Sequence, residues 1–278
     1  MSNSKIFLIT GVSSGLGKAF AEGALAAGHR VIGTVRSAGP ASSFLAHTSG
    51  RAHAVVIDVT DFGAIRDAIA RAERDVGPVD VLVNNAGYGH EGILEETPLE
   101  DVQRQFDANV FGAVAMIKAV LPGMRTRRSG HIVNVTSMGG FITMPGITAY
   151  CGSKFALEGI SESLGKEVKS LGIRVTALAP GQFRTEWAGR SMVRADRSIA
   201  DYDAVMDPIR AARQAKSGQQ PGDPAKAAQA LLTLIESDNP PVRLYLGADA
   251  LKLVEDKIEA MKAEIAAWET VSRSTNFE

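Results

Sequence analysis

The chain has 278 residues, a length that one α/β domain can reach and that allows a large core without disulfides. Its 30 Lys and Arg residues balance 31 Asp and Glu residues, and this near-neutral charge argues against a nucleic-acid surface. The single cysteine, Cys151, excludes an internal disulfide and a cysteine-based metal site and fits a reducing compartment. The apolar run Ile6–Ile9 is too short for a signal peptide, and we see no membrane-spanning run, so we expect a cytoplasmic protein.

Short apolar runs rich in β-branched residues recur along the chain, each bounded by turn residues. Runs of this kind are typical of strands that are buried on both faces of a parallel sheet. The predicted strands are Ile6–Thr10, Val31–Val35, Ala54–Val59, Val81–Asn84, His131–Thr136, Ile173–Ala179 and Val242–Leu246.

Helical signals fill the segments between these runs. A first helix is predicted from Leu16 to about Ala27, and Asp61 can cap a second that extends toward Asp75. Thr97-Pro98-Leu99-Glu100 has the pattern of a capping box that opens a long helix, and Asp223-Pro224 starts another. This alternation predicts a Rossmann-type, doubly wound parallel sheet of about seven strands between two helical layers, an α/β fold.

Two parts of the chain depart from this alternation within the one domain that we predict over residues 1–278. Residues 182–222 lack strand character, and we interpret them as a loop insertion near the substrate, with short helices as an option. Residues 249–270 form a helix with a narrow apolar stripe, which packs either on its own domain or on a partner. The stripe consists of Leu251, Val254, Ile258, Met261, Ile265 and Trp268.

A glycine-rich loop joins the first strand to the first helix. Gly11, Gly15 and Gly17 have the spacing G-x-x-x-G-x-G. Glycines at such a turn let backbone N–H groups approach a pyrophosphate, and the helix N-terminus that follows attracts the anion. We therefore expect a dinucleotide at this loop, with Ser13 and Ser14 as further contacts.

Arg36 lies at the end of the second strand, where dinucleotide folds often place an acid on the adenosine ribose. A guanidinium suits a 2′-phosphate, so Arg36 favours NADP over NAD. The alternative is that Arg36 is a solvated surface charge.

Tyr150 and Lys154 are four residues apart and would share one face of a helix. An ammonium beside a phenol favours the phenolate, so we expect Lys154 to lower the pKa of Tyr150 and to make it an acid/base near neutrality. The pair alone is weak evidence, because this spacing occurs by chance in many helices.

The pair occurs together with further motifs in a fixed order. Asn84-Asn85-Ala86-Gly87 follows the fourth strand, Asn109 lies in the next helix, Asn134-Val-Thr-Ser137 ends the fifth strand, and Pro180-Gly181 follows the sixth. In this order the motifs resemble the short-chain dehydrogenase/reductase family in its single-domain form. The residues of these motifs are most similar to those of the 17β-hydroxysteroid-dehydrogenase-like branch.

The resemblance implies four catalytic residues. Tyr150 would be the general acid in reduction and the base in oxidation, and Ser137 would hydrogen-bond the substrate oxygen. Lys154 would lower the Tyr150 pKa and hold the nicotinamide ribose. Asn109 would kink its helix and hold a water in a proton relay to Lys154. The substrate would be a small, fairly apolar carbonyl compound or secondary alcohol, and the protein a homodimer or homotetramer.

The resemblance also implies the cofactor contacts. Gly11, Gly15 and Gly17 would line the pyrophosphate, Asp58 and Val59 would meet the adenine, and Asn85, Ala86 and Gly87 would pack against the adenosine side. Tyr150, Lys154, Pro180, Gly181 and Thr185 would lie at the nicotinamide end. Ser13 and Ser14, beside Arg36, and Leu16 of the glycine loop complete the expected cofactor contacts. The sequence also leaves open whether five apolar residues line a pocket or pack in a core: Phe141, Met144, Phe183, Trp187 and Met192.

Two other functions compete with this interpretation. A catalytically silent NADP-binding sensor or scaffold would explain the apolar stripe, but it has no need of the catalytic set. An epimerase or dehydratase of a related extended fold usually has a larger C-terminal domain than this chain can hold. None of the five histidines has the spacing of a metal pair, so we expect no metal, and His90 is a weak candidate for substrate contact.

Overall fold

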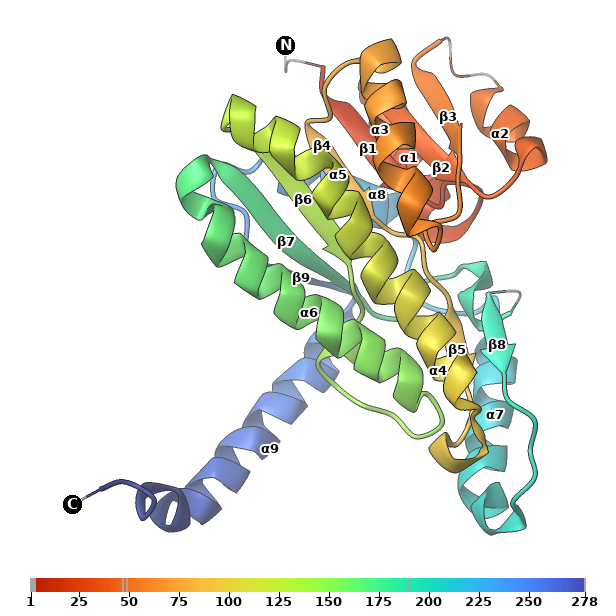
Figure 1. Ribbon diagram of the computed structural model, residues 1–278. Helices are drawn as coiled ribbons and strands as arrows, with labels where there is room; N and C mark the ends of the chain where they lie inside the picture. Colours follow the sequence, from red (N-terminus) through yellow and green to blue (C-terminus); the bar gives the residue numbers. More distant parts are fainter. Residues whose placement is uncertain (1–3, 47, 49, 190, 278) are drawn as a thin grey trace.

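The computed structural model describes residues 4–46, 48, 50–189 and 191–277. Its described residues form a central sheet of seven parallel strands in the order β3-β2-β1-β4-β6-β7-β9 (Figure 1). The strands are β1 (Ile6–Thr10), β2 (Arg30–Val35), β3 (Ala52–Val56), β4 (Val81–Asn84), β6 (Gly130–Val135), β7 (Ile173–Pro180) and β9 (Arg243–Leu246). The strand order reverses between β1 and β4, which is where such folds bind ligands at the carboxyl ends of the strands.

Helices cover both faces of the sheet and make the predicted three-layer α/β/α fold. One face carries α1 (Gly15–Ala26), α2 (Ala38–Leu45) and α8 (Pro224–Glu236). The other face carries α3 (Phe62–Val76), α5 (Gly112–Arg127) and α6 (Thr148–Val168). Short 3₁₀ turns occur at Leu94–Glu96, Met138–Gly140, Lys169–Leu171, Glu186–Ala188 and Ala200–Tyr202.

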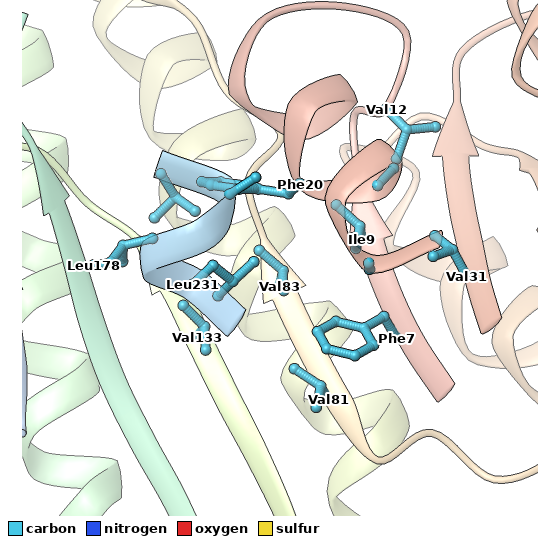
Figure 2. Packing of buried hydrophobic residues seen from close by; sticks show 14 of the residues in the cluster. Phe7, Ile9, Val12, Phe20, Val31, Val81, Val83, Val133, Leu178 and Leu231 are labelled. Atoms are coloured by element: carbon cyan, nitrogen blue, oxygen red, sulfur yellow. The ribbon is translucent and has the colours of Figure 1, made fainter. Parts of the chain in front are cut away.

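The pleat of each strand divides its apolar side chains between two cores. Phe7 and Ile9 of β1 pack with Phe20 of α1 and Leu231 of α8 (Figure 2). Leu8, between them in the sequence, points to the opposite core under α3 and α5. This alternation explains why the strands are apolar nearly throughout, since both faces of the sheet are covered.

Most of the predicted element ends are confirmed by their caps. The Asp61 carboxylate accepts a hydrogen bond from the Ala64 N–H at 3.2 Å, and Asp223 accepts one from Ala225 at 2.8 Å. The predicted capping box at Thr97 is wrong. The helix begins at Leu99 with Pro98 at the N-cap position, so Thr97 lies one residue before the cap, and its hydroxyl donates to the Ile93 carbonyl at 2.8 Å.

The predicted strand at residues 54–59 is displaced. The strand β3 spans Ala52–Val56, so Asp58 and Val59 follow it in a loop. The Asp58 carboxylate accepts hydrogen bonds from the backbone N–H and the hydroxyl of Thr60, at 2.9 and 2.8 Å. This turn competes with the strand for Asp58 and ends it early.

The long helix predicted from Pro98 is interrupted. It consists of α4 (Leu99–Phe106), a π-helical turn at Asp107–Phe111 and α5. By length and composition the whole segment, Leu99–Arg127, could cross a membrane, contrary to our reading of the sequence. In this fold Met116 and Met124 are fully buried in the core, which is the position of a core helix.

Residues 182–222 are more ordered than a loop insertion, although residue 190 lies outside the described residues. The segment contains β8 (Met192–Arg194) and a helix, α7 (Asp203–Lys216). Our expectation that it lacks strands is wrong, because β8 pairs in parallel with β5 (Gly89–Glu91). A strand of three residues leaves no readable pattern in the sequence.

The C-terminal helix, α9 (Ala248–Arg273), leaves the body of the molecule and projects away from it (Figure 1). Ala250 and Val254 at its start are buried in a small cluster with Met138 and Ile142. The rest of the predicted apolar stripe is exposed or nearly so.

Candidate active site

A cavity of about 970 Å³ opens at the carboxyl ends of the strands, around the point where the strand order reverses. It is lined by the loop after β1, the end of β2, the loops after β3, β4, β6 and β7, the start of α6 and one face of α7. The sequence motifs therefore meet at one edge of the sheet, as the parallel arrangement requires.

The glycine loop is shaped for close approach of a ligand. Gly11 and Gly15 have φ angles of +74° and +58°, which side chains other than glycine rarely adopt. A Cβ on Gly17 would overlap the Asn85 side chain and the Gly11 carbonyl oxygen. Gly17 does not line the cavity, so its role is to bring helix and loop together rather than to touch a ligand.

The N-terminus of α1 points at this cavity with its backbone N–H groups available. Ser14 occupies the N-cap position, but its side chain makes no cap hydrogen bond to the described residues. Ser13, Ser14, Gly15 and Leu16 all line the cavity. Free N–H groups and the positive end of a helix form an anion site. The residues present thus fit the pyrophosphate of a dinucleotide.

The loop after β4 is fixed to the end of β1. The Thr10 hydroxyl accepts hydrogen bonds from the backbone N–H groups of Asn85 and Ala86, at 2.9 and 2.8 Å. The Asn85 side chain donates to the Thr10 carbonyl at 2.9 Å. These bonds hold Asn85, Ala86 and Gly87 against the cavity, which all three line.

Arg36 is exposed at the end of β2 and lines the same cavity. A second hollow of about 1120 Å³ adjoins it, and Arg36, Ser13 and Ser14 line both. Lys18 and Ser37 also line the second hollow. Cations and hydroxyl groups therefore gather where the sequence predicts the adenosine ribose.

Tyr150 is buried near the start of α6, beside Ser137. The two side chains are hydrogen-bonded, and the Tyr150 ring packs on Trp187 with a centroid distance of 5.1 Å. The Ser137 hydroxyl also accepts a hydrogen bond from the Gly139 N–H at 3.0 Å. This bond fixes the serine side chain toward the cavity that Ser137 and Tyr150 both line.

Lys154 lies one helical turn after Tyr150, with its Nζ 5.8 Å from the Tyr150 ring centroid. Its ammonium donates to the Val135 carbonyl at 2.9 Å, which orients the side chain across the end of β6. Lys154 also lines the cavity, so it has donors left for a ligand.

The expected effect of Lys154 on Tyr150 is wrong in this structure. Burial raises the pKa of Tyr150 to about 12, although the hydrogen bond with Ser137 acts in the opposite direction. Burial also lowers the pKa of Lys154 to about 8, although the nearby Glu158 carboxylate raises it. Both shifts are towards the neutral form, because burial penalises the charged form of each group.

Asn109 lies in the π-helical turn and does not line the cavity. Its carbonyl oxygen accepts from the Tyr88 N–H, and its amide nitrogen donates to the Tyr88 carbonyl and to the Ser153 hydroxyl, all at 3.1 Å. Asn109 therefore ties the loop after β4 to α6. The kink expected at Asn109 is present as this π turn, a feature that often occurs at functional sites.

A buried polar chain anchors α6 to the sheet. The side-chain amide of Asn84 donates to the side-chain oxygen of Asn134 at 2.9 Å. The side-chain amide of Asn134 donates to the Ser161 hydroxyl at 2.8 Å. Ser161 in turn donates to the Leu157 carbonyl at 2.6 Å. These bonds fix the height of α6 against β4 and β6, and with it the position of Tyr150.

A comparison with known proteins agrees with this geometry. The family model for the short chain dehydrogenase matches residues 5–195. Oxidoreductase BOA17 of Botryotinia fuckeliana is 38% identical over 270 residues, which cover 96% of this chain and 98% of that protein.

The chain belongs to the short-chain dehydrogenase family. It is an NAD(P)-dependent oxidoreductase of that family. A short-chain dehydrogenase from Streptomyces avermitilis has the same fold, with a TM-score of 0.93 and 40% identity over 99% of this chain and 100% of that one. The structure of ElxO with NADP bound has a TM-score of 0.75 and 25% identity, and covers 90% of this chain and 100% of that one.

Within this short-chain dehydrogenase, the predicted site residues mostly converge. Of the nineteen predicted positions, seventeen line the cavity, and two, Gly17 and Asn109, lie outside its lining. The predicted residues that line the cavity are Gly11, Ser13, Ser14, Gly15, Leu16, Arg36, Asp58, Val59, Asn85, Ala86, Gly87, Ser137, Tyr150, Lys154, Pro180, Gly181 and Thr185.

Of the five apolar residues that could line a pocket or pack in a core, three line the cavity. Met144, Phe183 and Trp187 line the cavity, whereas Phe141 and Met192 do not. His90 is buried and lies 3.4 Å from the Asp101 carboxylate, away from the cavity lining.

The sequence left a helix within residues 182–222 as an option but did not predict that α7 supplies part of the cavity wall, through Ile209, Ala212, Arg213 and Lys216. Glu91 of β5 holds this helix in place. Its carboxylate has no exposed surface and accepts from Arg213 at 2.7 Å and Arg210 at 3.0 Å. Glu91 is one of three acids among residues 88–96, and the sequence does not distinguish it from a surface charge.

Proposed function

We propose that this short-chain dehydrogenase transfers a hydride between NADP(H) and the carbonyl or secondary alcohol of a fairly apolar substrate, with Tyr150 as the acid/base. The convergence of Ser137, Tyr150 and Lys154 in one cavity with the glycine loop is the observation that supports it. When bound, the nicotinamide supplies or accepts the hydride.

In reduction Tyr150 gives its proton to the carbonyl oxygen, and Ser137 holds that oxygen through a hydrogen bond. With a pKa of about 12, the Tyr150 phenol carries its proton at neutral pH. Lys154 holds the ribose hydroxyls next to the nicotinamide. Asn109 is a positioning residue that keeps α6 and the loop after β4 in register.

The preference for NADP rests on Arg36. Its guanidinium, Ser13, Ser14, Lys18 and Ser37 line adjoining hollows at the end of β2, where a 2′-phosphate would accept their hydrogen bonds.

The apolar character of the substrate rests on the wall around Tyr150. This wall consists of Met138, Met144, Ile147, Phe183, Trp187, Val193, Ile209 and Ala212. A pocket of this kind binds by burying apolar surface and leaves orientation to a few polar groups.

The test is a screen of ketones, aldehydes and quinones that follows NADPH absorbance with the wild type and with Tyr150→Phe. We expect turnover of at least one apolar carbonyl compound by the wild type. Loss of the phenol should lower kcat by about 100- to 10,000-fold, the range of general acid catalysis, and leave NADPH binding intact.

Tyr88→Phe is the matched control, because Tyr88 also lines the cavity but its ring hydroxyl has no part in the proposed proton transfer. Equal activity of Tyr150→Phe and the wild type would refute the role of Tyr150. Tight NADPH binding without turnover of any compound would favour the sensor or scaffold function.

A further inference from the structure

The helix α9 carries an apolar stripe that its own domain leaves uncovered (Figure 1). Ile258 and Met261 are each 38% exposed, Ile265 67% and Trp268 62%. At 26 residues the helix is about 39 Å long, and its own domain buries only its first two turns, through Ala250 and Val254. Water-exposed apolar stripes of this kind mark interaction surfaces.

We propose that α9 pairs antiparallel with α9 of a second copy of this chain, in one specific register. The stripe has the 3-4 spacing of a coiled-coil seam. With the pair centred between Ile258 and Met261, Leu251 faces Trp268 of the partner subunit and Ile258 faces Met261 of the partner subunit, each twice by symmetry. Ile265 lies level with Val254 of the partner subunit, which its own domain buries.

The charges beside the seam select this arrangement. In an antiparallel pair, each residue that flanks the seam faces a partner residue at the same heptad position, because the two chains run in opposite directions. In this register Glu255 faces Lys262 of the partner subunit, and Lys257 faces Glu264 of the partner subunit. Symmetry doubles both contacts, so four pairs of opposite charge flank five exposed apolar residues from each chain.

In two other arrangements of the same helices, residues of like charge would face each other. A parallel pair would place Lys257 against Lys262 and Glu264 against Glu269. An antiparallel pair shifted by one heptad, which would use the exposed residues alone, would place Glu255 against Glu269 and Lys262 against Lys262. The charge pattern thus excludes these two competitors and favours the register with the longest seam.

The start of the helix adds apolar surface to this pairing. Leu251 is 49% exposed there, and Phe141, Met144 and Tyr245 are half-buried against the cluster that contains Ala250 and Val254. The proposed register brings Trp268 and Ile265 of the partner subunit to this surface. A stripe of this length is short for an independent coiled coil, and contact with the domain at both ends compensates for that.

The first test is the oligomeric state of the full chain by sedimentation velocity over a range of concentrations. We expect a wild-type assembly whose dissociation constant rises about 100-fold or more in Ile265→Asp, because the change places a charge in the seam of both chains. Circular dichroism and NADPH binding verify that the variant is folded. A monomeric wild type, or an assembly that Ile265→Asp does not weaken, would overturn the proposal.

The second test reads the orientation. Lys257→Glu should weaken the assembly in the antiparallel register, whereas it would strengthen a parallel pair. Adding Glu264→Lys should restore the wild-type affinity. Lys252→Glu makes the same charge change away from the seam and should leave the affinity unchanged. Strengthening by Lys257→Glu, or a monomer that binds phospholipid vesicles through this stripe, would refute the antiparallel pair.

Discussion

Glu91→Gln tests how the wall of the cavity is held. In the wild type, Glu91 joins β5 to α7 through Arg210 and Arg213, and Arg194 Nε lies 3.3 Å from the same carboxylate. Glutamine keeps the shape but removes the charge, and its amide group faces guanidinium donors. Breaking a buried ion pair from one side costs about 3–5 kcal/mol.

The loss should appear in α7 rather than in the whole domain. Among its described side chains, Met206 is the one that is buried, so polar contacts hold the helix: those of Glu91 and the ion pairs of Arg197 with Asp203 and Asp207. A local loss of about 3 kcal/mol raises the open population of α7 about 100-fold or more, which amide hydrogen exchange of residues 203–216 measures directly. Glu22→Gln, in an exposed pair with Lys18, is the control and should change exchange little.

The same contact gives a pH dependence of known sign. The hydrogen bonds and charges of the arginines lower the pKa of Glu91 below its ordinary 4.5, although burial opposes them. The stabilisation is therefore complete above pH 4.5 and is lost as the pH falls through the lowered pKa. Protection of α7 in the wild type should approach that of Glu91→Gln in acid. Equal protection of the two proteins at pH 7 would refute the anchoring role of Glu91.

Three further variants test the cofactor side. Arg36→Asp should weaken NADPH and relatively favour NADH in steady-state kinetics, and an unchanged preference would remove Arg36 from the proposal. Asn109→Ala leaves the Tyr88 N–H without its partner, although Gln105 still donates to the Tyr88 carbonyl, and should lower the free energy of unfolding in urea by about 1–3 kcal/mol. Gly17→Ala forces a Cβ against Asn85, so it should lower both NADPH affinity and stability, the latter by about 1–3 kcal/mol; unchanged values would contradict the close packing.

The strands were predictable because their burial on two faces leaves an unbroken apolar run in the sequence. Ile6–Thr10 and Val81–Asn84 were predicted with their observed ends. Most site positions followed as well, since parallel strands bring their carboxyl ends to one edge. Polar groups that end strands must then share that edge.

The rest depends on tertiary contacts that no local pattern encodes. The pKa of Tyr150 is set by burial that the spacing to Lys154 does not reveal. The anchoring of α7 depends on Glu91, which lies more than a hundred residues away along the chain. The apolar stripe of α9 predicted the helix, but whether its own domain covers the stripe is decided by the direction in which the helix leaves β9.

The most direct test of the central claim is a single turnover with the enzyme in excess over NADPH and an apolar ketone from the screen. Our account predicts that Tyr150→Phe binds NADPH as the wild type does but transfers hydride at least about 100-fold more slowly. Transfer at the wild-type rate with Tyr150→Phe would contradict it.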